Sequence, residues 1–315
     1  MTNMDIERKT MLNEREAESC YLGQFIPLHY HHNMLMDNNR MQGFKAAIDH
    51  VVFPGAKVLE LGGGTGVLSW FAAAKADKVW CVEFNPDMVN EANRLLAQNL
   101  NGHKVEVVHA DAFEYLPPEP VDIVICEMIH VAMLREKLVE VIENFKQRYL
   151  EKFGGPLPIF MPEAIVMAVQ PVQQDYNFEG YIAPIVQFQE TTVIYTGTKE
   201  LAQPALYSII DFDQPVDMII EWQGTFIIEN KGKLNALRFI TKNILSVVQA
   251  QSSTIDWLNH YMVLPLPNAI DVKSGDIVDV NFKYRAGGSI ASLQNALQAS
   301  IRQAEILTIE ETTVA

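Results

Sequence analysis

The sequence has little positive charge. It holds 24 Lys and Arg against 39 Asp and Glu, which gives a formal net charge of −15 and a pI of about 4.9. Binding to nucleic acid needs a basic surface that meets the phosphates, so this charge balance argues against nucleic acid as a main partner. The same acidity is compatible with a small cationic substrate, which a negative surface attracts.

Cysteine and long apolar runs are also scarce. The three cysteines, Cys20, Cys81 and Cys126, form no C-x-x-C pair and no even-numbered disulfide framework, so we expect a protein of the reducing cytoplasm. The N-terminus is polar and no apolar run reaches the length of a membrane span, so neither a signal peptide nor a membrane partner is predicted. Histidines gather at positions 29–32 without a Cys or carboxylate set beside them, so no metal site is predicted.

One stretch organises the rest of the chain. Residues 58–61 predict a buried strand that runs into a loop with Gly62, Gly64 and Gly66, and residues 67–75 predict a helix. A strand, a tight glycine turn and a helix N-terminus form a ligand cradle, because backbone N–H groups point outward there. The spacing is G-x-G-x-G, not the G-x-G-x-x-G of dinucleotide folds, and it resembles the first motif of S-adenosylmethionine (SAM) methyltransferases.

Two acids follow the next two predicted strands. Glu83 ends the strand 78–83, about 20 residues past the first glycine, where an acid can accept both ribose hydroxyls of a nucleoside. Asp111 and Ala112 follow the strand 105–110. In the methyltransferases that the motif resembles, an acid at this place takes the adenine amino group. These acids favour a cofactor site over a plain strand–helix turn.

Strand and helix patterns alternate from the glycine loop onward, which predicts an α/β fold with a doubly wound, Rossmann-like parallel sheet. Glu127 follows one of these strands directly and is expected at the site, because ligands lie outside the carboxyl ends of such strands. Glu136 is either a solvated helix acid or is brought beside Glu127 by a loop that returns over the site. The alternating segments are 58–61, 67–75, 78–83, 87–99, 105–110, 121–126 and 132–150.

The alternation ends at a Gly-Gly-Pro linker near residue 155, and an all-β, barrel-like domain is predicted beyond it. We predict three parts: N-terminal helices over 1–52, a Rossmann-like SAM-binding domain over 53–157 and a β-barrel-like domain over 158–315. The closing segment, 290–307, fits either a helix or a strand. The strands predicted for the β domain are 165–169, 192–195, 208–211, 218–222, 225–228, 237–240, 262–264 and 277–282.

Before the first strand, residues 34–52 predict a helix whose apolar stripe includes Asp37. Burying a carboxylate without a partner is costly, so Asp37 needs one. Arg40, one turn on, could form a local ion pair, and a residue on a packed element could serve equally well.

Together these segments resemble one family over most of the chain, the protein arginine methyltransferases. Residues 31–40, His-x-x-Met-Leu-x-Asp-x-x-Arg, are similar to the family's segment before its Rossmann-like domain. Glu127 and Glu136 have the spacing of its paired-glutamate loop, and residues 160–163 resemble the start of its barrel. The resemblance implies SAM as the cofactor and an arginine guanidino group as the methyl acceptor.

The resemblance also implies roles for further residues. Arg40 would hold the SAM carboxylate, His31 and Met34 would line the cofactor and substrate pocket, and Tyr21 would close over the cofactor. The family usually has an aspartate at the first position of the glycine motif, where this chain has a glutamate. The residues that match this motif are Glu60, Gly62, Gly64 and Gly66.

The chain departs from the family pattern in two places. Ile255-Asp256-Trp257 stands where the family has Thr-His-Trp, so the histidine that normally pairs with the helix aspartate is missing. Asp256 and Trp257 are still expected in the substrate pocket, together with Met34 and Asp37. The insertion that forms the family's dimer arm is short and lies within residues 176–205, which leaves a homodimer open.

The paired glutamates suit a guanidinium. An arginine side chain stays protonated in water and is a poor nucleophile, but two carboxylates can grip its donor fork and draw the positive charge toward themselves. Glu127 and Glu136 are therefore expected as the clamp, with one of them accepting the released proton.

We therefore predict a SAM-dependent N-methyltransferase of guanidino groups. Free arginine or a small arginine derivative is expected to be preferred to arginine within a protein, because Asp256 could receive a free α-amino group. A methyltransferase for another small amine or natural-product acceptor is one alternative, and a non-catalytic SAM-binding partner protein is another.

Overall fold

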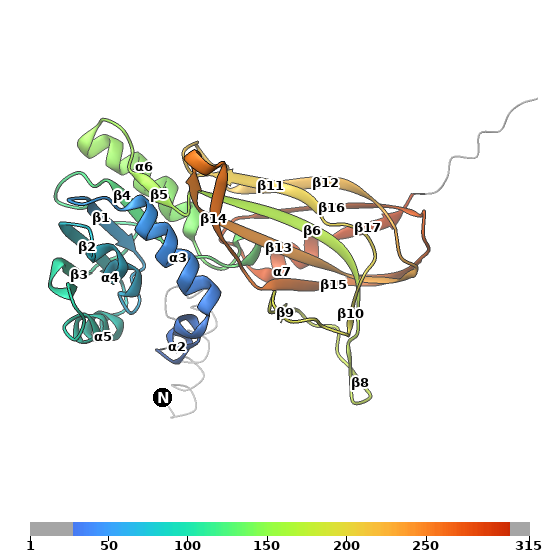
Figure 1. Ribbon diagram of the computed structural model, residues 1–315. Helices are drawn as coiled ribbons and strands as arrows, with labels where there is room; N and C mark the ends of the chain where they lie inside the picture. The colour runs from blue at the N-terminus through green and yellow to red at the C-terminus, as the bar shows by residue number, and fades with distance from the viewer. Residues whose placement is uncertain (1–27, 303–315) are drawn as a thin grey trace, which may run out of the picture.

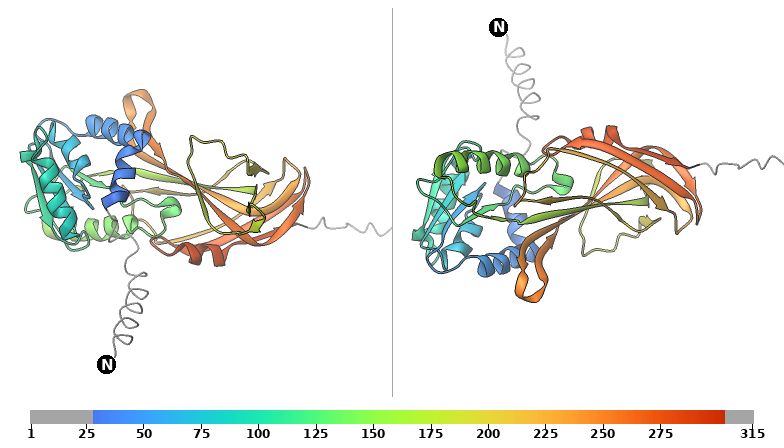
Figure 2. Two further views of the ribbon diagram at one scale, coloured as in Figure 1. Left: turned by 90° about the horizontal axis from the view of Figure 1, so that it is seen from below. Right: turned by 90° about the horizontal axis from the view of Figure 1, so that it is seen from above.

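The structure is a computed structural model that describes residues 28–302. An open parallel sheet with helices lies at one end of the molecule and antiparallel sheets lie at the other (Figure 1). Views from below and above show the same two-part arrangement, with the N-terminal helices beside the parallel sheet (Figure 2). This order of a Rossmann-like sheet followed by β-sheets confirms the predicted fold class.

The parallel sheet has β1 at its centre and the strand order β3-β2-β1-β4-β5. Its inner strands β2, β1 and β4 are mostly buried because both faces are covered by helices, whereas the edge strand β3 is partly exposed. The chain order reverses between β1 and β4, and ligands of such sheets bind at that reversal. The strands are β1 (Lys57–Leu61), β2 (Lys78–Glu83), β3 (Val105–His109), β4 (Ile123–Cys126) and β5 (Ile159–Met161).

Three helices and two short 3₁₀ turns connect these strands. Asn85 caps α5, since its side chain accepts a hydrogen bond from the Asp87 N–H and Pro86 follows in the first turn. The helix predicted over 132–150 begins later, at Leu138, and a loop precedes it. The elements are α4 (Val67–Ala73), α5 (Pro86–Leu96), α6 (Leu138–Phe153), η1 (Gly102–Lys104) and η2 (Val131–Met133).

The N-terminal segment contains two helices where a single one was predicted. α2 spans Leu28–Met36 and α3 spans Asn38–Val51, with Asp37 between them. Asp37 has an extended backbone conformation and its side chain accepts the N–H of Arg40 at 2.9 Å. The carboxylate thus caps the N-terminus of α3, and Asp is a preferred residue at this position because it can accept such an N–H. Because the cap starts a new helix, the predicted single helix is wrong.

The antiparallel end, which we call the barrel half, is built around the long strand β13, which pairs with β6, β14 and β15. Its elements are β6 (Ala164–Gln174), β7 (Asn177–Phe178), β8 (Tyr181–Ile182), β9 (Gln187–Gln189), β10 (Thr198–Glu200), β11 (Ala205–Asp211), β12 (Ile219–Ile227), β13 (Gly232–Val248), η3 (Gln249–Gln251), β14 (Ser253–Leu258), β15 (Tyr261–Val272), β16 (Ile277–Arg285), α7 (Ile290–Ala296) and β17 (Gln298–Ile301).

Three details of the barrel half differ from the prediction. Residues 192–195 are turn and loop, so the strand predicted there is wrong. The strands predicted over 218–222 and 225–228 are one continuous strand, β12, because Gly224 keeps its place in the ladder opposite Val280. The closing segment, predicted as either a helix or a strand, contains both, since it forms the helix α7 and then the strand β17.

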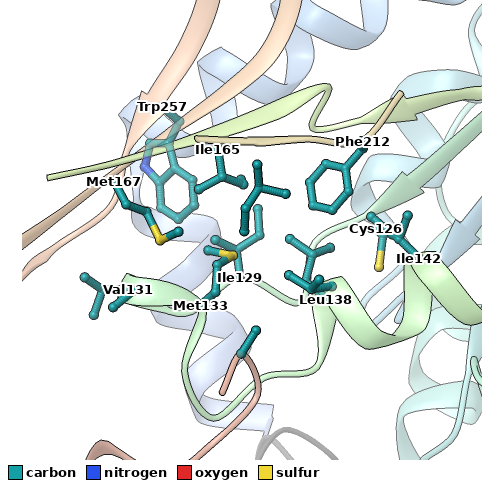
Figure 3. Packing of buried hydrophobic residues seen from close by; sticks show 14 of the residues in the cluster. Cys126, Ile129, Val131, Met133, Leu138, Ile142, Ile165, Met167, Phe212 and Trp257 are labelled. Carbon is teal, nitrogen blue, oxygen red and sulfur yellow. The ribbon is translucent and has the colours of Figure 1, made fainter. Parts of the chain in front are cut away.

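The two ends of the molecule share one apolar core. α3 packs closely on the barrel half at Gly43, where an added Cβ would lie 3.3 Å from Leu245 Cδ1, and Phe44 contacts Trp257 at 6.2 Å between ring centres. Figure 3 shows Ile165 and Phe212 of the barrel half among side chains of the parallel-sheet end. The relative position of the two ends is therefore fixed by buried side chains.

Candidate active site

A cavity lies at the carboxyl ends of the parallel strands, where the chain order reverses. The loops after β1, β2, β3 and β4 all contribute to it, and α2 and α3 close one side. Its walls include most of the residues that the sequence singled out: His31, Met34, Arg40, Glu60, Gly62, Gly64, Glu83, Asp111, Ala112, Glu127 and Glu136. Tyr21 lies outside the described residues.

The glycine loop and Glu83 form one connected unit. The Gly64 N–H donates to Glu83 Oε2 and the Asn85 N–H donates to Oε1, both at 2.8 Å. A carboxylate has about four acceptor sites, so two remain for hydroxyl groups of a ligand. Gly64 has a φ of +52°, and a Cβ there would lie 2.8 Å from Cε1 of His31. The loop therefore needs glycine both for its backbone conformation and for the approach of His31.

Asp111 lies at the end of β3 on the same cavity wall. Its Oδ1 accepts the Phe113 N–H at 2.9 Å, which fixes the direction of the carboxyl group. Ala112, between them, leaves the wall without a bulky side chain. An acid held in this way beside apolar walls is suited to an amino group on a flat aromatic ring.

Glu60 lines the cavity, but its carboxylate has a partner within the protein. Oε2 accepts hydrogen bonds from the N–H and the hydroxyl of Ser69 in the first turn of α4. Burial raises the pKa of Glu60 to about 7, although the Ser69 hydrogen bonds lower it. Glu60 thus stabilises the helix that follows the glycine loop, in addition to its place in the wall.

Arg40 and Glu127 form a bidentate salt bridge in the cavity wall. Arg40 Nε donates to Glu127 Oε1 at 3.2 Å and Nη2 donates to Oε2 at 2.5 Å. The side chains are only 8% and 12% exposed. Burial by itself would lower the pKa of Arg40, but the charge and hydrogen bonds of Glu127 raise it above its ordinary value. Asp37 therefore has no ion pair with the Arg40 side chain, and the local pair considered from the sequence is replaced by the helix cap.

Glu136 is in the cavity and not on a solvated helix face. It precedes α6 by two residues and lines the same wall as Glu127. Within residues 28–302 its carboxylate makes no hydrogen bond or ion pair. Burial, and then the charge of Glu127, raise the pKa of Glu136 to about 8, against the opposite effect of Arg40 and Arg135. Burial therefore favours the protonated form of Glu136 in the free protein.

Three residues expected in the substrate pocket, Asp37, Asp256 and Trp257, are not part of the cavity wall. The Asp256 carboxylate forms an ion pair with Lys242 at 3.0 Å and accepts from the Thr254 hydroxyl at 2.9 Å, and it is not part of the cavity wall. Trp257 is buried against Phe44 instead of facing the cavity. The Asp256 and Trp257 side chains point to opposite faces of β14, because neighbouring side chains alternate along a strand.

Other residues of the wall were not singled out from the sequence. Gly63 is one, since a Cβ there would lie 2.2 Å from the sulfur of Cys81. The sequence shows that Gly63 belongs to the glycine run, but it does not show that this glycine packs against Cys81 of the next strand. Further wall residues from loops and from α6, which no motif marks, include Phe113, Met128, Lys137 and Val141.

Among residues 28–302, no helix is long and apolar enough to cross a bilayer. In the same part of the chain, no three His, Cys, Asp or Glu side chains are grouped so that they could hold a metal ion.

Comparison with known proteins agrees with this geometry. A family described as "Methyltransferase domain" matches residues 58–152. An uncharacterized protein of Methanocaldococcus jannaschii is 26% identical over 84% of this chain and 95% of its own length. A protein arginine N-methyltransferase of Arabidopsis thaliana is 29% identical over 54% of this chain, and one of Dictyostelium discoideum is 26% identical over 56%. This chain covers only 45% and 52% of those two enzymes.

Solved structures show the same fold. The Trypanosoma brucei PRMT1 enzyme–prozyme heterotetrameric complex with AdoHcy matches with a TM-score of 0.65, at 15% identity, over 87% of this chain and 98% of that one. Arabidopsis thaliana protein arginine methyltransferase 10 matches with a TM-score of 0.67, at 18% identity, over 84% and 89%. The chain thus carries a methyltransferase domain with distant similarity to protein arginine methyltransferases over about half its length, and it shares their fold.

Proposed function

We propose that this protein is a SAM-dependent N-methyltransferase that acts on the guanidino group of arginine. The observation that carries the proposal is the meeting of two carboxylates, Glu127 and Glu136, in one cavity with the glycine loop. Glu127 already pairs with the Arg40 guanidinium in the bidentate geometry that arginine and carboxylate favour, which supports a carboxylate able to bind guanidinium groups. A carboxylate has about four acceptor sites, so Glu127 can hold Arg40 and a second guanidinium.

The cavity fits SAM. Gly64 leaves the loop open where a side chain would meet His31, and Glu83 has spare acceptor sites for ribose hydroxyls. Asp111 is directed by the Phe113 N–H and would take the adenine amino group. Arg40 would hold the carboxylate of the methionine part. When bound, SAM supplies a methyl group on a sulfonium, which an in-line nitrogen can attack.

The two glutamates would then make the substrate nitrogen a better nucleophile. Glu127 and Glu136 would grip the substrate guanidinium and hold its positive charge on the side away from the methyl group, which leaves the reacting nitrogen with more lone-pair density. A bound substrate cation would favour the ionised form of Glu136, with the carboxyl proton released to solvent, and the carboxylate could then accept the proton that the methylated nitrogen releases.

Within this function, we propose free arginine or a small arginine derivative as the preferred acceptor. The support is now the net charge of −15, which attracts small cations. Asp256 no longer supports the preference, because its carboxylate is paired with Lys242 outside the cavity wall.

The deciding experiment is a competition with one SAM pool. Free arginine and an arginine–glycine-rich peptide are mixed at equal concentration, and the methylated products are identified by mass spectrometry. Methylarginine formed mainly from the free amino acid supports both parts of the proposal, and a clear excess of methylated peptide refutes the preference alone. A screen in which only other amines or hydroxyl compounds accept the methyl group would refute guanidino transfer, and SAM binding without any transfer would indicate a non-catalytic partner protein.

We also propose a homodimer. The segment after β6 exposes several large apolar side chains, of which Tyr181 is 74% and Ile194 is 93% exposed. Exposed apolar clusters of this kind mark interaction surfaces in soluble proteins. Light scattering of Ile194→Asp against the unchanged protein tests it: a dimer that dissociates in the variant supports the proposal, and a monomer in both contradicts it.

A further inference from the structure

The loop that carries Glu136 is held in an unfavourable backbone conformation. Ala132, Met133 and Arg135 all have positive φ, at 59°, 53° and 61°. Residues with a Cβ rarely adopt this left-handed region, because the Cβ comes too close to the following carbonyl oxygen. The Glu136 N–H donates to the Leu134 carbonyl at 2.6 Å, which closes a tight three-residue turn around Arg135. Such a conformation persists only where surrounding contacts enforce it.

Those contacts come from the barrel half. The Ala132 N–H donates to Oγ1 of Thr241 at 2.8 Å, across 109 residues of sequence. The Arg135 N–H donates to the Gly288 carbonyl and the Gly287 N–H donates to the Met133 carbonyl, both at 2.7 Å. Each of the three left-handed residues is therefore tied by its own backbone group to a residue of the barrel half.

Apolar side chains of the same loop are anchored beside these hydrogen bonds. Figure 3 shows Ile129 and Met133 of the loop pointing into the buried cluster that also holds Ile165 and Met167 of β6. Ala132 and Leu134 are fully buried. The loop is thus fixed on its apolar side, while Glu136 at its end faces the cavity.

Thr241 is the one side chain among the three barrel partners, since the other two act through their backbones. It is fully buried on β13. Its backbone is rigid, because Thr241 is paired with Met167 in the ladder and its carbonyl accepts the Asn259 N–H at 3.0 Å. Its hydroxyl therefore presents a fixed acceptor to the first strained residue of the loop.

We propose that Thr241 is a positioning residue for the methyl-transfer reaction: its hydroxyl holds the loop in the strained conformation that places Glu136 in the cavity. The inference rests on the proposed function, because it assumes that Glu136 grips the substrate. Without the hydroxyl, the buried Ala132 N–H loses its acceptor, and a loop that relaxes away from the left-handed region moves Glu136. The cofactor end of the cavity has no such tie to Thr241.

The test compares Thr241→Val, which keeps the shape and removes the acceptor, with Thr241→Ser, which keeps the hydroxyl. We expect Thr241→Val to lower kcat at least ~10-fold, because small displacements of a reacting group have large effects on rate. SAM affinity should stay within about twofold, and Thr241→Ser should restore most of the rate. Hydrogen exchange of the amides in residues 129–137 should be faster in Thr241→Val only.

Tyr207→Phe is the matched control. It removes another buried hydroxyl of the barrel half, which lies 3.0 Å from the Tyr284 hydroxyl and 3.4 Å from the sulfur of Met167 and makes no hydrogen bond to residues 129–137. Its kcat should be unchanged even if its thermal stability falls. The proposal is overturned if Thr241→Val keeps the normal exchange rate in residues 129–137, or if Tyr207→Phe lowers kcat as much as Thr241→Val does. Full activity of Glu136→Gln would instead overturn the proposed function, and loop exchange in Thr241→Val would still decide the Thr241 contact.

Discussion

The two ends of the cavity are built in different ways. At the cofactor end, the tie between Gly64 and Glu83 joins residues 19 positions apart, within one strand–helix–strand unit. At the acceptor end, Glu127 is tied to Arg40 across 87 positions, and the loop before Glu136 is tied to Thr241 across 109. The tie between the glycine loop and Glu83 can therefore form from local structure, while the surroundings of Glu127 and Glu136 form only when the barrel half and α3 are docked.

Because of this difference, we expect that SAM binding and the catalytic rate can be changed by different substitutions. Changes in the glycine loop should remove SAM binding and leave the docking of the barrel half intact. Changes in the contacts between the barrel half and the loop before Glu136 should lower the rate and leave SAM binding intact. A variant that breaks this rule would show that the two ends are coupled.

The largest effect is expected at the glycine loop. Gly64→Val places a side chain against His31 at a φ of +52° and should weaken SAM binding by roughly 100-fold, since crowding of this kind costs a few kcal/mol. Isothermal titration calorimetry on the folded variant measures it. Gly275→Val is the control, because Gly275 also has positive φ, at +90°, with nothing within 4 Å of an added Cβ. Equal SAM affinity in the two variants would mean that the loop is only a turn.

A smaller effect is expected for the pH dependence of stability. The pKa of Glu136 is raised to about 8 in the folded protein, from an ordinary value of 4.5, so the folded state binds the proton more tightly than the unfolded state does. The free protein should therefore lose stability as pH rises from about 5 to 8. Glu136→Gln removes this loss and should be more stable than the unchanged protein by about 1 kcal/mol or more at pH 8, with little difference at pH 5.

Denaturant unfolding at both pH values, without ligand, provides the check. The control is Glu140→Gln on α6, which is on the protein surface and forms only a long contact with Arg285, at 3.6 Å. A difference between Glu136→Gln and the unchanged protein that is the same at pH 5 and pH 8 would contradict a raised pKa at Glu136.

The smallest effect is expected at Asp256. Its pair with Lys242 is partly exposed, and such pairs contribute about 0–1 kcal/mol. Asp256→Ala should leave KM and kcat for free arginine within about twofold. A large rise in KM with free arginine, and none with a peptide, would mean that Asp256 contacts the substrate. The barrel half would then have to rearrange on binding.

The same contrast explains what the sequence could predict. The fold class and the strands with their helices were predictable, because apolar periodicity and turn residues are local signals. The break at Asp37 was missed, because a helix-capping aspartate and an aspartate on an apolar stripe look alike until the backbone is seen. The predicted strand over 192–195 was wrong, because short apolar segments gain strand structure only from a neighbour to pair with.

The acceptor end was only partly predictable. The spacing of Glu127 and Glu136 marked both as candidates, but their surroundings depend on contacts far apart in sequence, such as that between Ala132 and Thr241. Nothing in the sequence around Asp256 reveals Lys242 as its partner. Long-range pairings of this kind are decided by how the two halves pack, and no periodicity records them.

The most direct test of the account is the rate of Glu136→Gln with arginine, measured beside its SAM affinity on the same preparation. The account predicts that kcat falls at least ~10²-fold while the dissociation constant for SAM stays within about threefold, because the lost charge contacts the reacting group and not the cofactor. Glu136 is the better choice than Glu127, which also holds Arg40. A variant that methylates arginine at the full rate would contradict the paired-glutamate mechanism.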